Sequence, residues 1–340
     1  MRTLVTGAMG FISGYLVEEL LGAGHEVIGL DNFSKYGPVQ KSYDSHSSYR
    51  FVRGDAKDAG TLKDLLAGAD HFVAGAAMIG GISYFHAYAY DLLAENERIT
   101  AAAFDAALHA HRHGKLQKIT VVSSSMVFEN TSEYPTPEGA ERRSPPPSST
   151  YGFQKLATEY FARGAWEQYQ LPYTIARPFN CVGIGESRAL GDQTIASGNV
   201  KLAMSHVLPD IVQKVLKGQD PLHILGSGKQ IRHYTYGGDV ARGIRLAIES
   251  PAARNEDINI STSVKTTVLE LAELVWRKIH GESKHFHYVS DPPFPYDVQV
   301  RSPDVSKAER LIGFRADTGL DTVLDEVIPW IRGQIAQGGI

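Results

Sequence analysis

The stretch that decides the fold is residues 3–14, TLVTGAMGFISG, close to the start of the chain. Its first four residues favour a buried β-strand, and the periodic apolar residues that follow it predict a helix. Gly7 permits a tight turn between the two elements, and Gly10 lets the backbone approach a pyrophosphate. The helix N-terminus adds free N–H groups and a dipole that favour such an anion. The stretch therefore predicts a dinucleotide-binding site.

An acidic residue at the end of the next predicted strand indicates which dinucleotide is bound. Asp31 follows this strand at roughly the 20-residue spacing expected for a carboxylate on the adenosine ribose. A carboxylate there accepts hydrogen bonds from ribose hydroxyls and repels a 2′-phosphate, so we expect NAD rather than NADP. Residues 54–56 and 75–77 follow later strands and are expected to lie along the same cofactor. The residues expected to bind it are Gly7, Met9, Gly10, Phe11, Ile12, Asp31, Asn32, Asp55, Ala56, Gly75, Ala76 and Ala77.

Strands and helices alternate through the first half of the chain, which is typical of βαβ units and a parallel sheet. The predicted strands are Thr3–Thr6, Glu26–Leu30, Tyr49–Arg53, His71–Ala74, Lys118–Ser123 and Tyr173–Arg177. The predicted helices between them are Leu16–Gly22, Gly60–Leu66, Asp91–His113 and Gln154–Tyr169. We therefore expect an α/β fold with a Rossmann-type doubly wound parallel sheet.

The pattern changes after Asn180, where residues 183–198 are rich in glycine and charge and predict a long loop. The segments after it predict a smaller mixed α/β substrate-binding lobe, with the elements Ser205–Leu216, Asp239–Glu249, Asp257–Ile260, Leu269–Ile279 and Leu320–Arg332. We expect residues 1–178 plus 235–252 to form the NAD-binding domain. Residues 179–234 plus 253–340 are expected to form the second lobe.

Composition excludes several classes of protein. The 340 residues are 43% hydrophobic and 21% charged, and no apolar run reaches the roughly 20 residues of a membrane helix. The N-terminus lacks the pattern of a signal peptide, so we expect a cytoplasmic protein. The single cysteine, Cys181, excludes an internal disulfide and a multi-cysteine zinc site, and we expect no metal. A formal net charge of −4 without a basic stripe argues against nucleic-acid binding.

A phenol and an ammonium four residues apart suggest the chemistry. Tyr151 and Lys155 lie at i and i+4, on one face of a predicted helix. A nearby lysine charge favours the phenolate, so Tyr151 can take the proton of a substrate hydroxyl as hydride leaves its carbon. Lys155 can also hold the nicotinamide ribose. Ser123, Ser124 and Ser125 end the fifth predicted strand, where ligands of open α/β sheets bind, and one of these hydroxyls can share the substrate oxygen.

With these motifs the sequence resembles the extended short-chain dehydrogenase/reductase family, in particular its nucleotide-sugar epimerases and dehydratases. The resemblance covers nearly the whole chain and also includes residues 177–180, 232–239, 301–304 and 306–308. It implies that Tyr151 is the base, that Lys155 supports it and the cofactor, and that Ser124 is the catalytic serine. It also implies that Asn180, Arg232 and Arg301 contact a nucleotide diphosphate and that the chain forms a homodimer through its two long helices.

Departures from the family pattern narrow the reaction. The place of the third glycine is taken by Ser13, which is expected to loosen the packing of helix on strand. Sugar 4,6-dehydratases carry an acidic pair directly after the catalytic threonine, where Ser125 and Met126 stand here and are expected to line the substrate site. Without a carboxylate at these positions, the groups that would remove water are missing. The leading hypothesis is therefore a nucleotide-diphosphate-sugar epimerase that oxidises C4 transiently and returns the hydride to the opposite face.

Two alternatives stay open. Residues 77–82 and 205–209 resemble the branch that contains GDP-mannose 3,5-epimerase and GDP-fucose synthase, which implies that His206 is an acid/base for epimerisation at C3 or C5. The first acid/base of that branch is a cysteine, in the place that Met126 occupies here, and Cys181 is expected to be buried and inert. The second alternative is a regulatory protein that binds dinucleotide without turnover. The intact set of Ser124, Tyr151 and Lys155 argues against it.

Overall fold

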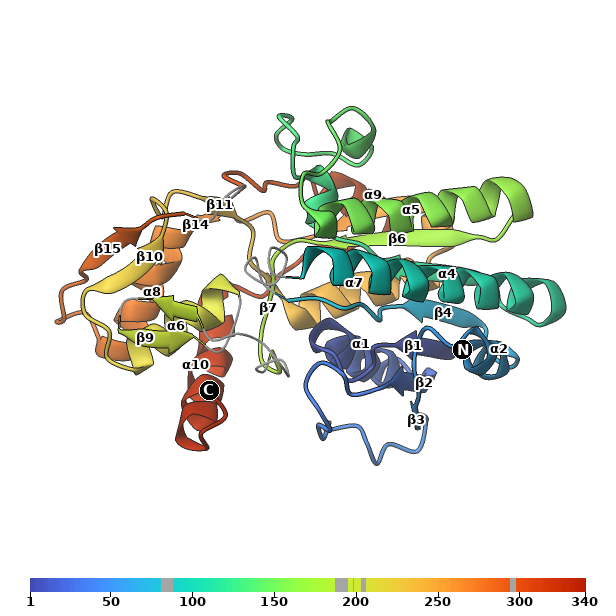
Figure 1. The fold of residues 1–340 in the computed structure, drawn as a ribbon, viewed down its shortest axis with the longest axis horizontal. Helices are drawn as coiled ribbons and strands as arrows, with labels where there is room; N and C mark the ends of the chain where they lie inside the picture. The colour runs from blue at the N-terminus through green and yellow to red at the C-terminus, as the bar shows by residue number, and fades with distance from the viewer. Residues whose placement is uncertain (81–87, 187–194, 198, 203–205, 294–297) are drawn as a thin grey trace.

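A parallel sheet forms the larger part of the computed structural model, which describes the chain except residues 81–87, 187–194, 198, 203–205 and 294–297. The sheet has seven strands in the order β13-β6-β5-β4-β1-β2-β3, all paired in parallel (Figure 1). Its strands are β1 (Arg2–Thr6), β2 (Glu26–Asp31), β3 (Tyr49–Arg53), β4 (His71–Ala74), β5 (Lys118–Val122), β6 (Tyr173–Pro178) and β13 (Glu256–Ile260). The order reverses direction between β1 and β4, which is the doubly wound arrangement predicted.

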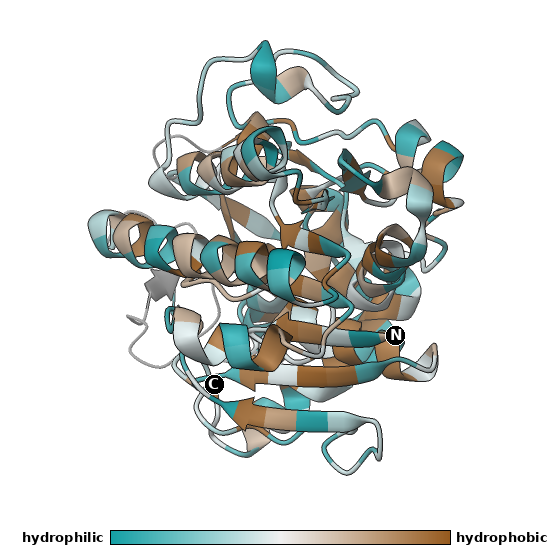
Figure 2. Ribbon diagram, turned by 90° about the vertical axis from the view of Figure 1, so that its right-hand side faces the viewer, coloured by the Kyte–Doolittle hydropathy of each residue, from teal (hydrophilic) through white to brown (hydrophobic). Residues whose placement is uncertain are grey.

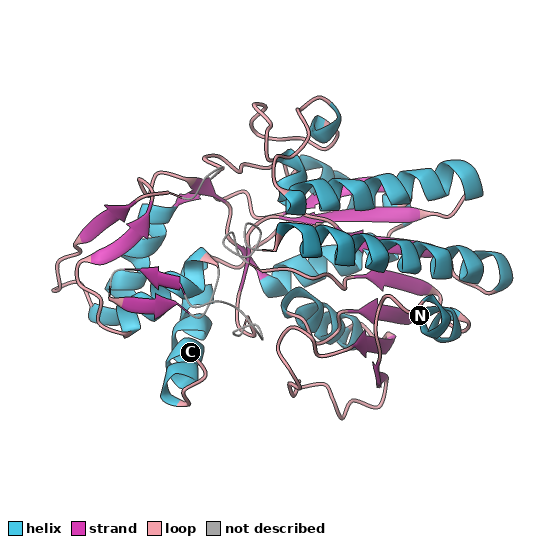
Figure 3. Cartoon of the chain, viewed as in Figure 1, coloured by secondary structure: helices cyan, strands magenta, loops and turns pink. Residues whose placement is uncertain are grey.

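Helices cover both faces of this sheet (Figure 3). They are α1 (Phe11–Gly22), α2 (Ala59–Leu66), α4 (Ala89–His113), α5 (Thr150–Tyr169), α7 (Gly237–Glu249) and α9 (Ser306–Ile312). One core joins the sheet to α2, α4 and α5, and a separate core joins its other face to α1, α7 and α9. The inner strands are mostly buried and carry the brown, hydrophobic bands of Figure 2, because helices cover both faces of the sheet, whereas the edge strand β3 is only partly buried.

The second lobe packs around Trp276, which is fully buried. Its helices are α6 (Val207–Leu216), α8 (Val268–His280) and α10 (Leu320–Ala336). Its strands form small pairs, namely β10 (Leu222–Leu225) with β15 (Tyr288–Asp291), β11 (Ile231–Arg232) with β14 (Thr266–Thr267), and β8 (Ile195–Ser197) with β9 (Val200–Leu202). The chain leaves the sheet through β7 (Cys181–Val182) and returns through β12 (Thr235–Tyr236), and these two strands pair with each other. The second lobe is thus connected to the sheet beside β6.

The predicted division of the chain is wrong for two segments. Residues 253–340 were expected in the second lobe, but β13 pairs with β6 from Glu256 to Ile260 and is the edge strand of the large sheet. α9 also packs in the core of that domain. A strand-forming run does not reveal which sheet it will join, because the pairing is with a strand about 80 residues earlier.

Three smaller differences concern the ends and loops. α1 begins at Phe11, five residues before the predicted start, so its first turn directly follows the glycine turn. β8 lies inside the segment predicted as a loop. The helix predicted to begin at Ser205 begins at Val207 in the structure, and Ser205 itself lies outside the described residues. Residues 81 and 82 of the predicted glycine loop also lie outside them. None of the described helices is long and apolar enough to cross a membrane.

Candidate active site

A cleft of about 910 Å³ opens at the carboxyl ends of the strands and extends into the second lobe between α6 and β10. Every residue predicted to bind the cofactor or the substrate, or to act in catalysis, lines it. These residues are Gly7, Met9, Gly10, Phe11, Ile12, Asp31, Asn32, Asp55, Ala56, Gly75, Ala76, Ala77, Ser124, Ser125, Met126, Tyr151, Lys155, Asn180, His206, Arg232 and Arg301. The fold therefore brings together groups that are up to 294 residues apart in the sequence, from Gly7 to Arg301.

The turn between β1 and α1 has the shape that a dinucleotide needs. Gly7 has a φ of +71°, and its N–H donates to the Leu30 carbonyl at 2.8 Å. A Cβ on Gly7 would lie 2.9 Å from Ala76 Cα, so a side chain here would push the two loops apart. Gly10 is the N-cap of α1 and has no side chain to satisfy the first N–H groups of the helix. These N–H groups fit the pyrophosphate of the cofactor.

Ser13 packs tightly where the family has its third glycine. The serine is 6% exposed, and a Cβ on Gly75 would lie only 2.9 Å from Ser13 Oγ. The absence of a side chain at Gly75 makes room for the hydroxyl. The glycine after β4 thus accommodates the serine in α1, and the expected loosening of helix against strand stays a prediction.

Backbone hydrogen bonds hold the Asp31 carboxylate at the end of β2. Its Oδ2 accepts from the Met9 N–H at 3.0 Å, and its Oδ1 accepts from the Phe33 N–H at 2.7 Å. Each carboxylate oxygen can accept a further hydrogen bond, so the group can still receive two ribose hydroxyls. The same contacts tie the glycine turn to the residue that is predicted to discriminate against a 2′-phosphate.

Ser124 and Tyr151 meet at the centre of the cleft. Ser124 precedes the short helix η1 (Ser125–Phe128), and Tyr151 lies in the first turn of α5, which Ser149 caps by accepting from the Gly152 N–H at 3.0 Å. Burial raises the pKa of Tyr151, whereas its hydrogen bond with Ser124 and the charge of Arg301 act in the opposite direction without cancelling the effect. Ser124 and Arg301 thus act against burial at the phenol, and both favour the form that can accept a proton.

Lys155 lies one turn further along α5 and is also buried. Its Nζ donates to the Val122 carbonyl at 2.8 Å and lies 6.0 Å from the centre of the Tyr151 ring. Burial lowers the pKa of Lys155 to about 8, with Glu159 acting in the opposite direction. The expectation that Lys155 lowers the pKa of Tyr151 is wrong for this structure, because the groups that lower it are Ser124 and Arg301.

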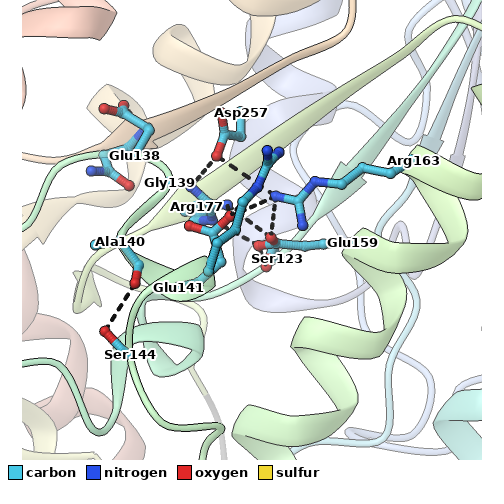
Figure 4. Close-up of polar contacts among 12 residues, drawn as sticks. Ser123, Glu138, Gly139, Ala140, Glu141, Ser144, Glu159, Arg163, Arg177 and Asp257 are labelled. Atoms are coloured by element: carbon cyan, nitrogen blue, oxygen red, sulfur yellow. Dashed lines mark hydrogen bonds and ion pairs between the residues drawn. The ribbon is translucent and has the colours of Figure 1, made fainter.

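A buried network of charges holds these elements together, and sequence reasoning missed it (Figure 4). Glu159 accepts from both Nε and Nη2 of Arg177 at 2.7 Å, and Glu159 Oε1 also accepts from Ser123 Oγ at 2.6 Å. Arg177 Nη1 lies 2.7 Å from Asp257 Oδ2 on the edge strand. The network thus joins β5, β6, β13 and α5 directly behind Ser124. The spacing of Glu159, four residues after Lys155, was the available signal.

The substrate side of the cleft carries two arginines. Arg232 belongs to β11, and Arg301 lies in the segment after residue 297. The Arg301 N–H donates to the Ile231 carbonyl at 3.1 Å. Asn180 has a φ of +40°, and its carbonyl accepts from the Thr235 N–H at 3.1 Å, so it lies where β7 and β12 begin to pair. Arginine is suited to the planar oxygens of phosphates. This part of the cleft can therefore hold a diphosphate.

The remaining side chains at the substrate end differ from a dehydratase. Ser125 and Met126 are both buried at the cleft wall, and neither can supply a carboxylate. Glu129 also lines the cleft, but its Oε2 accepts from the N–H and the hydroxyl of Ser149 and so stabilises the start of α5. The cysteine predicted to be buried is only partly buried. Cys181 also lines the cleft, so the expectation of a buried cysteine is wrong. Desolvation raises the pKa of its thiol, so the group stays protonated.

His206 forms an ion pair with a carboxylate that the sequence did not indicate. Its Nδ1 contacts Glu186 Oε1, and both residues line the cleft. The Glu186 side chain is 8% exposed and that of His206 is 47% exposed. Burial alone would raise the pKa of Glu186, but the charges of His206 and Lys35 lower it. The contact through Nδ1 leaves Nε2 of the imidazole for a ligand.

Comparisons with known proteins agree with this geometry. The family model described as "NAD dependent epimerase/dehydratase family" matches residues 3–261. A Bacillus subtilis (strain 168) protein named "Uncharacterized UDP-glucose epimerase YtcB" is 28% identical over 342 residues, covering 97% of this chain and 98% of that protein. A UDP-N-acetyl-alpha-D-glucosaminuronate decarboxylase of Bacillus cytotoxicus is also 28% identical, over 337 residues, with 97% and 98% covered.

A solved structure extends the likeness to the whole fold. A variant of UDP-glucuronic acid 4-epimerase from Bacillus cereus, solved with UDP-4-deoxy-4-fluoro-glucuronic acid and NAD, has a TM-score of 0.80 and 26% identity, covering 98% of this chain and 99% of that one. The predicted resemblance, the fold class and NAD as the cofactor are confirmed. The chain belongs to the NAD-dependent epimerase/dehydratase family of enzymes.

Proposed function

We propose that this enzyme is a nucleotide-diphosphate-sugar epimerase that oxidises the sugar at C4, releases the ketose to turn in the cleft, and returns the hydride to the opposite face. The observation that carries the proposal is the meeting of Ser124 and Tyr151 at the centre of a cleft whose dehydratase positions hold Ser125 and Met126. NAD supplies the hydride acceptor. Relatives named as epimerases bind UDP-sugars, whereas another relative is named a decarboxylase, so the epimerase assignment rests on the residues of this chain.

The proton and the hydride leave the substrate in complementary steps. Tyr151 takes the proton of the C4 hydroxyl, with Ser124 holding the same oxygen, as the hydride leaves C4 for the cofactor. Lys155 is placed to hold the nicotinamide ribose from the side of β5. Reversal of both steps on the other face of the sugar then gives the epimer, and no solvent proton enters at carbon. Arg232, Arg301 and Asn180 hold the diphosphate while the sugar turns.

Incubation with a panel of UDP-, GDP-, CDP- and dTDP-sugars tests the proposal. We expect interconversion of C4 epimers without added cofactor, measured by chromatography and NMR of the products. Elimination of water or loss of carbon dioxide as the main reaction would refute it.

A second candidate reaction is favoured by His206 and Glu186. A carboxylate on Nδ1 orients the imidazole, and an oriented imidazole in the cleft suits an acid/base that acts at C3 or C5 of a 4-keto sugar. Reaction in D₂O would then place deuterium at that carbon, and His206→Asn would abolish the incorporation. A product without deuterium, from an active His206→Asn enzyme, would exclude this reaction and leave C4 epimerisation in place.

Aromatic side chains on the two long helices support a homodimer as part of the proposal. Tyr90 of α4 and Tyr160 of α5 are 78% and 61% exposed, and Phe153 is 48% exposed. α4 and α5 pack against each other, so these exposed aromatic side chains belong to neighbouring helices and can be covered by a second copy of the chain. Sedimentation of the purified enzyme should give twice the mass of the chain, and Tyr160→Glu should shift it to the monomer.

A further inference from the structure

Beyond the two arginines the cleft continues between α6 and β10 of the second lobe. Asp210 and Lys214 line this end from α6, and they stand one helical turn apart on the same face. His223, Ile224 and Leu225 of β10 form the facing wall. Asp210 and Lys214 are not among the residues predicted from the sequence, although His206 precedes them on α6 and its carbonyl accepts from the Asp210 N–H at 3.1 Å.

Asp210 lacks the contacts that a buried carboxylate needs. Its Oδ1 is buried and has no hydrogen-bond partner among the described residues. Burial raises the pKa of Asp210 well above its ordinary value, with the charge of Lys214 acting in the opposite direction. Among the described ion pairs none joins the two side chains, although they are neighbours on the helix. A buried acceptor without a donor is costly, and a ligand that brings N–H groups would remove that cost.

Lys214 supplies the complementary charge. Its Nζ donates to the His223 carbonyl at 2.8 Å, and this contact fixes the ammonium at the wall of the cleft. An ammonium has three donors, so the group can still donate to a ligand oxygen. Apolar side chains lie beside the pair, because Ile211 and Ile224 are 3% and 2% exposed and both line the cleft. The end of the cleft thus combines apolar walls with one acceptor group and one donor group.

The position identifies the part of the substrate that lies here. In the proposed function, on which this inference rests, the sugar lies at Tyr151 and the diphosphate at Arg232 and Arg301. The nucleobase must then lie beyond the arginines, between α6 and β10. Flat base faces match the apolar walls, and the polar base edge meets Asp210 and Lys214.

We infer that the base is guanine and that the substrate is a GDP-sugar, with Asp210 accepting from N1–H and N2–H and Lys214 donating to O6. Guanine has two adjacent N–H donors on one edge, so both carboxylate oxygens receive a hydrogen bond. Uracil and thymine have one N–H between two carbonyl oxygens, and one of those oxygens would face the carboxylate. Cytosine and adenine have an amino group beside a ring nitrogen that accepts, so they too would oppose one carboxylate oxygen.

Calorimetric titration of the NAD-loaded enzyme with nucleoside diphosphates tests this inference without a sugar. We expect GDP to bind more tightly than UDP, dTDP, CDP and ADP. IDP, which lacks only the 2-amino group, should bind at least about tenfold more weakly than GDP, since a hydrogen bond to a charged group is lost. Asp210→Asn should bring the affinities for GDP and IDP close together, because the amide no longer offers two acceptors.

Lys214 has a matched control on the same helix end. Lys214→Met should weaken the binding of GDP and the binding of IDP by similar factors of about ten or more, because both bases carry O6. Lys217→Met removes an exposed lysine outside the cleft and should leave both affinities unchanged. Bound NAD and the thermal midpoint of each variant show whether it is folded.

Each contrary result has one meaning. Tightest binding of UDP or dTDP, equal binding of GDP and IDP, or an Asp210→Asn enzyme that still prefers GDP over IDP would overturn the assignment of guanine. An epimerase that converts UDP-sugars and binds GDP weakly would keep the proposed function and lose this inference. An enzyme that binds GDP selectively but converts no GDP-sugar would keep this inference and refute the proposed function.

Discussion

Replacing Arg177 by methionine tests the network behind the catalytic serine. The guanidinium is fully buried and makes two hydrogen bonds of 2.7 Å to Glu159 and a 2.7 Å ion pair with Asp257. Methionine fills part of the volume but leaves these carboxylates buried without their main partner. Breaking a buried ion pair by removing one side costs about 3–5 kcal/mol of the free energy of unfolding. At roughly 2–4 °C per kcal/mol, the midpoint of thermal unfolding should fall by about 6–20 °C.

Acid should reduce the difference in stability between the native enzyme and Arg177→Met. Burial alone would raise the pKa of Asp257, but the charges of Arg177 and Lys307 lower it well below its ordinary value. A carboxyl whose folded pKa is lowered stabilises the protein above its unfolded pKa of about 4, and this contribution is lost as the pH falls toward the folded pKa. The native enzyme should therefore lose more stability than Arg177→Met between pH 7 and pH 3.

Urea unfolding followed by circular dichroism at several pH values measures both effects. Arg98→Met is the control, because Arg98 makes a single pair with Glu95 and its side chain is 59% exposed. An exposed pair of this kind contributes at most about 1 kcal/mol. If Arg177→Met costs no more than Arg98→Met, or if its deficit grows in acid, the network does not stabilise the fold as we argue.

Three further predictions concern the cofactor and the chemistry. Tyr151→Phe should keep fold and bound NAD but lose at least about a hundredfold in kcat, because the phenol oxygen is the group that takes the substrate proton; an unchanged kcat would remove Tyr151 from the mechanism. Nucleotide released by denaturing the native enzyme should be NAD(H), and Asp31→Ala should weaken the preference for NAD over NADP in titrations; an unaltered preference would show that Asp31 does not discriminate. Gly7→Ala should purify without NAD, since the new Cβ would lie 2.9 Å from Ala76 Cα at a φ of +71°; a full complement of NAD would contradict the need for glycine there.

The cofactor half of the site could be predicted from the sequence because its determinants are local. A strand, a glycine turn and a helix follow one another within residues 3–22, and the next strand brings Asp31 to the same edge. Tyr151 and Lys155 share a helix face for the same reason. Even in this half of the site one contact depends on a distant segment, because the missing side chain of Gly75 leaves room for Ser13.

The electrostatics of the site could not be predicted in this way. The pKa of Tyr151 depends on Ser124 and Arg301, which lie 27 residues before it and 150 residues after it, and not on the nearby Lys155 that the spacing suggested. The partner of His206 is Glu186, which lies 20 residues earlier in the chain. Asp210 reads in the sequence as an ordinary acidic residue in the first turn of a helix.

By itself, then, the sequence determined the doubly wound sheet through its periodicity. Local motifs predicted where NAD lies and paired Tyr151 with Lys155, whereas the role of Ser124 was implied by the resemblance to the family. Only the tertiary structure decided that β13 closes the edge of the large sheet and that Arg177 and Glu159 join β6, α5 and β13 beside Ser123. It also decided that Asp210 has a buried oxygen without a partner among the described residues. Burial and pairing of charges depend on contacts between segments that are far apart in the chain. No local pattern encodes those contacts, and only the packing of the folded chain creates them.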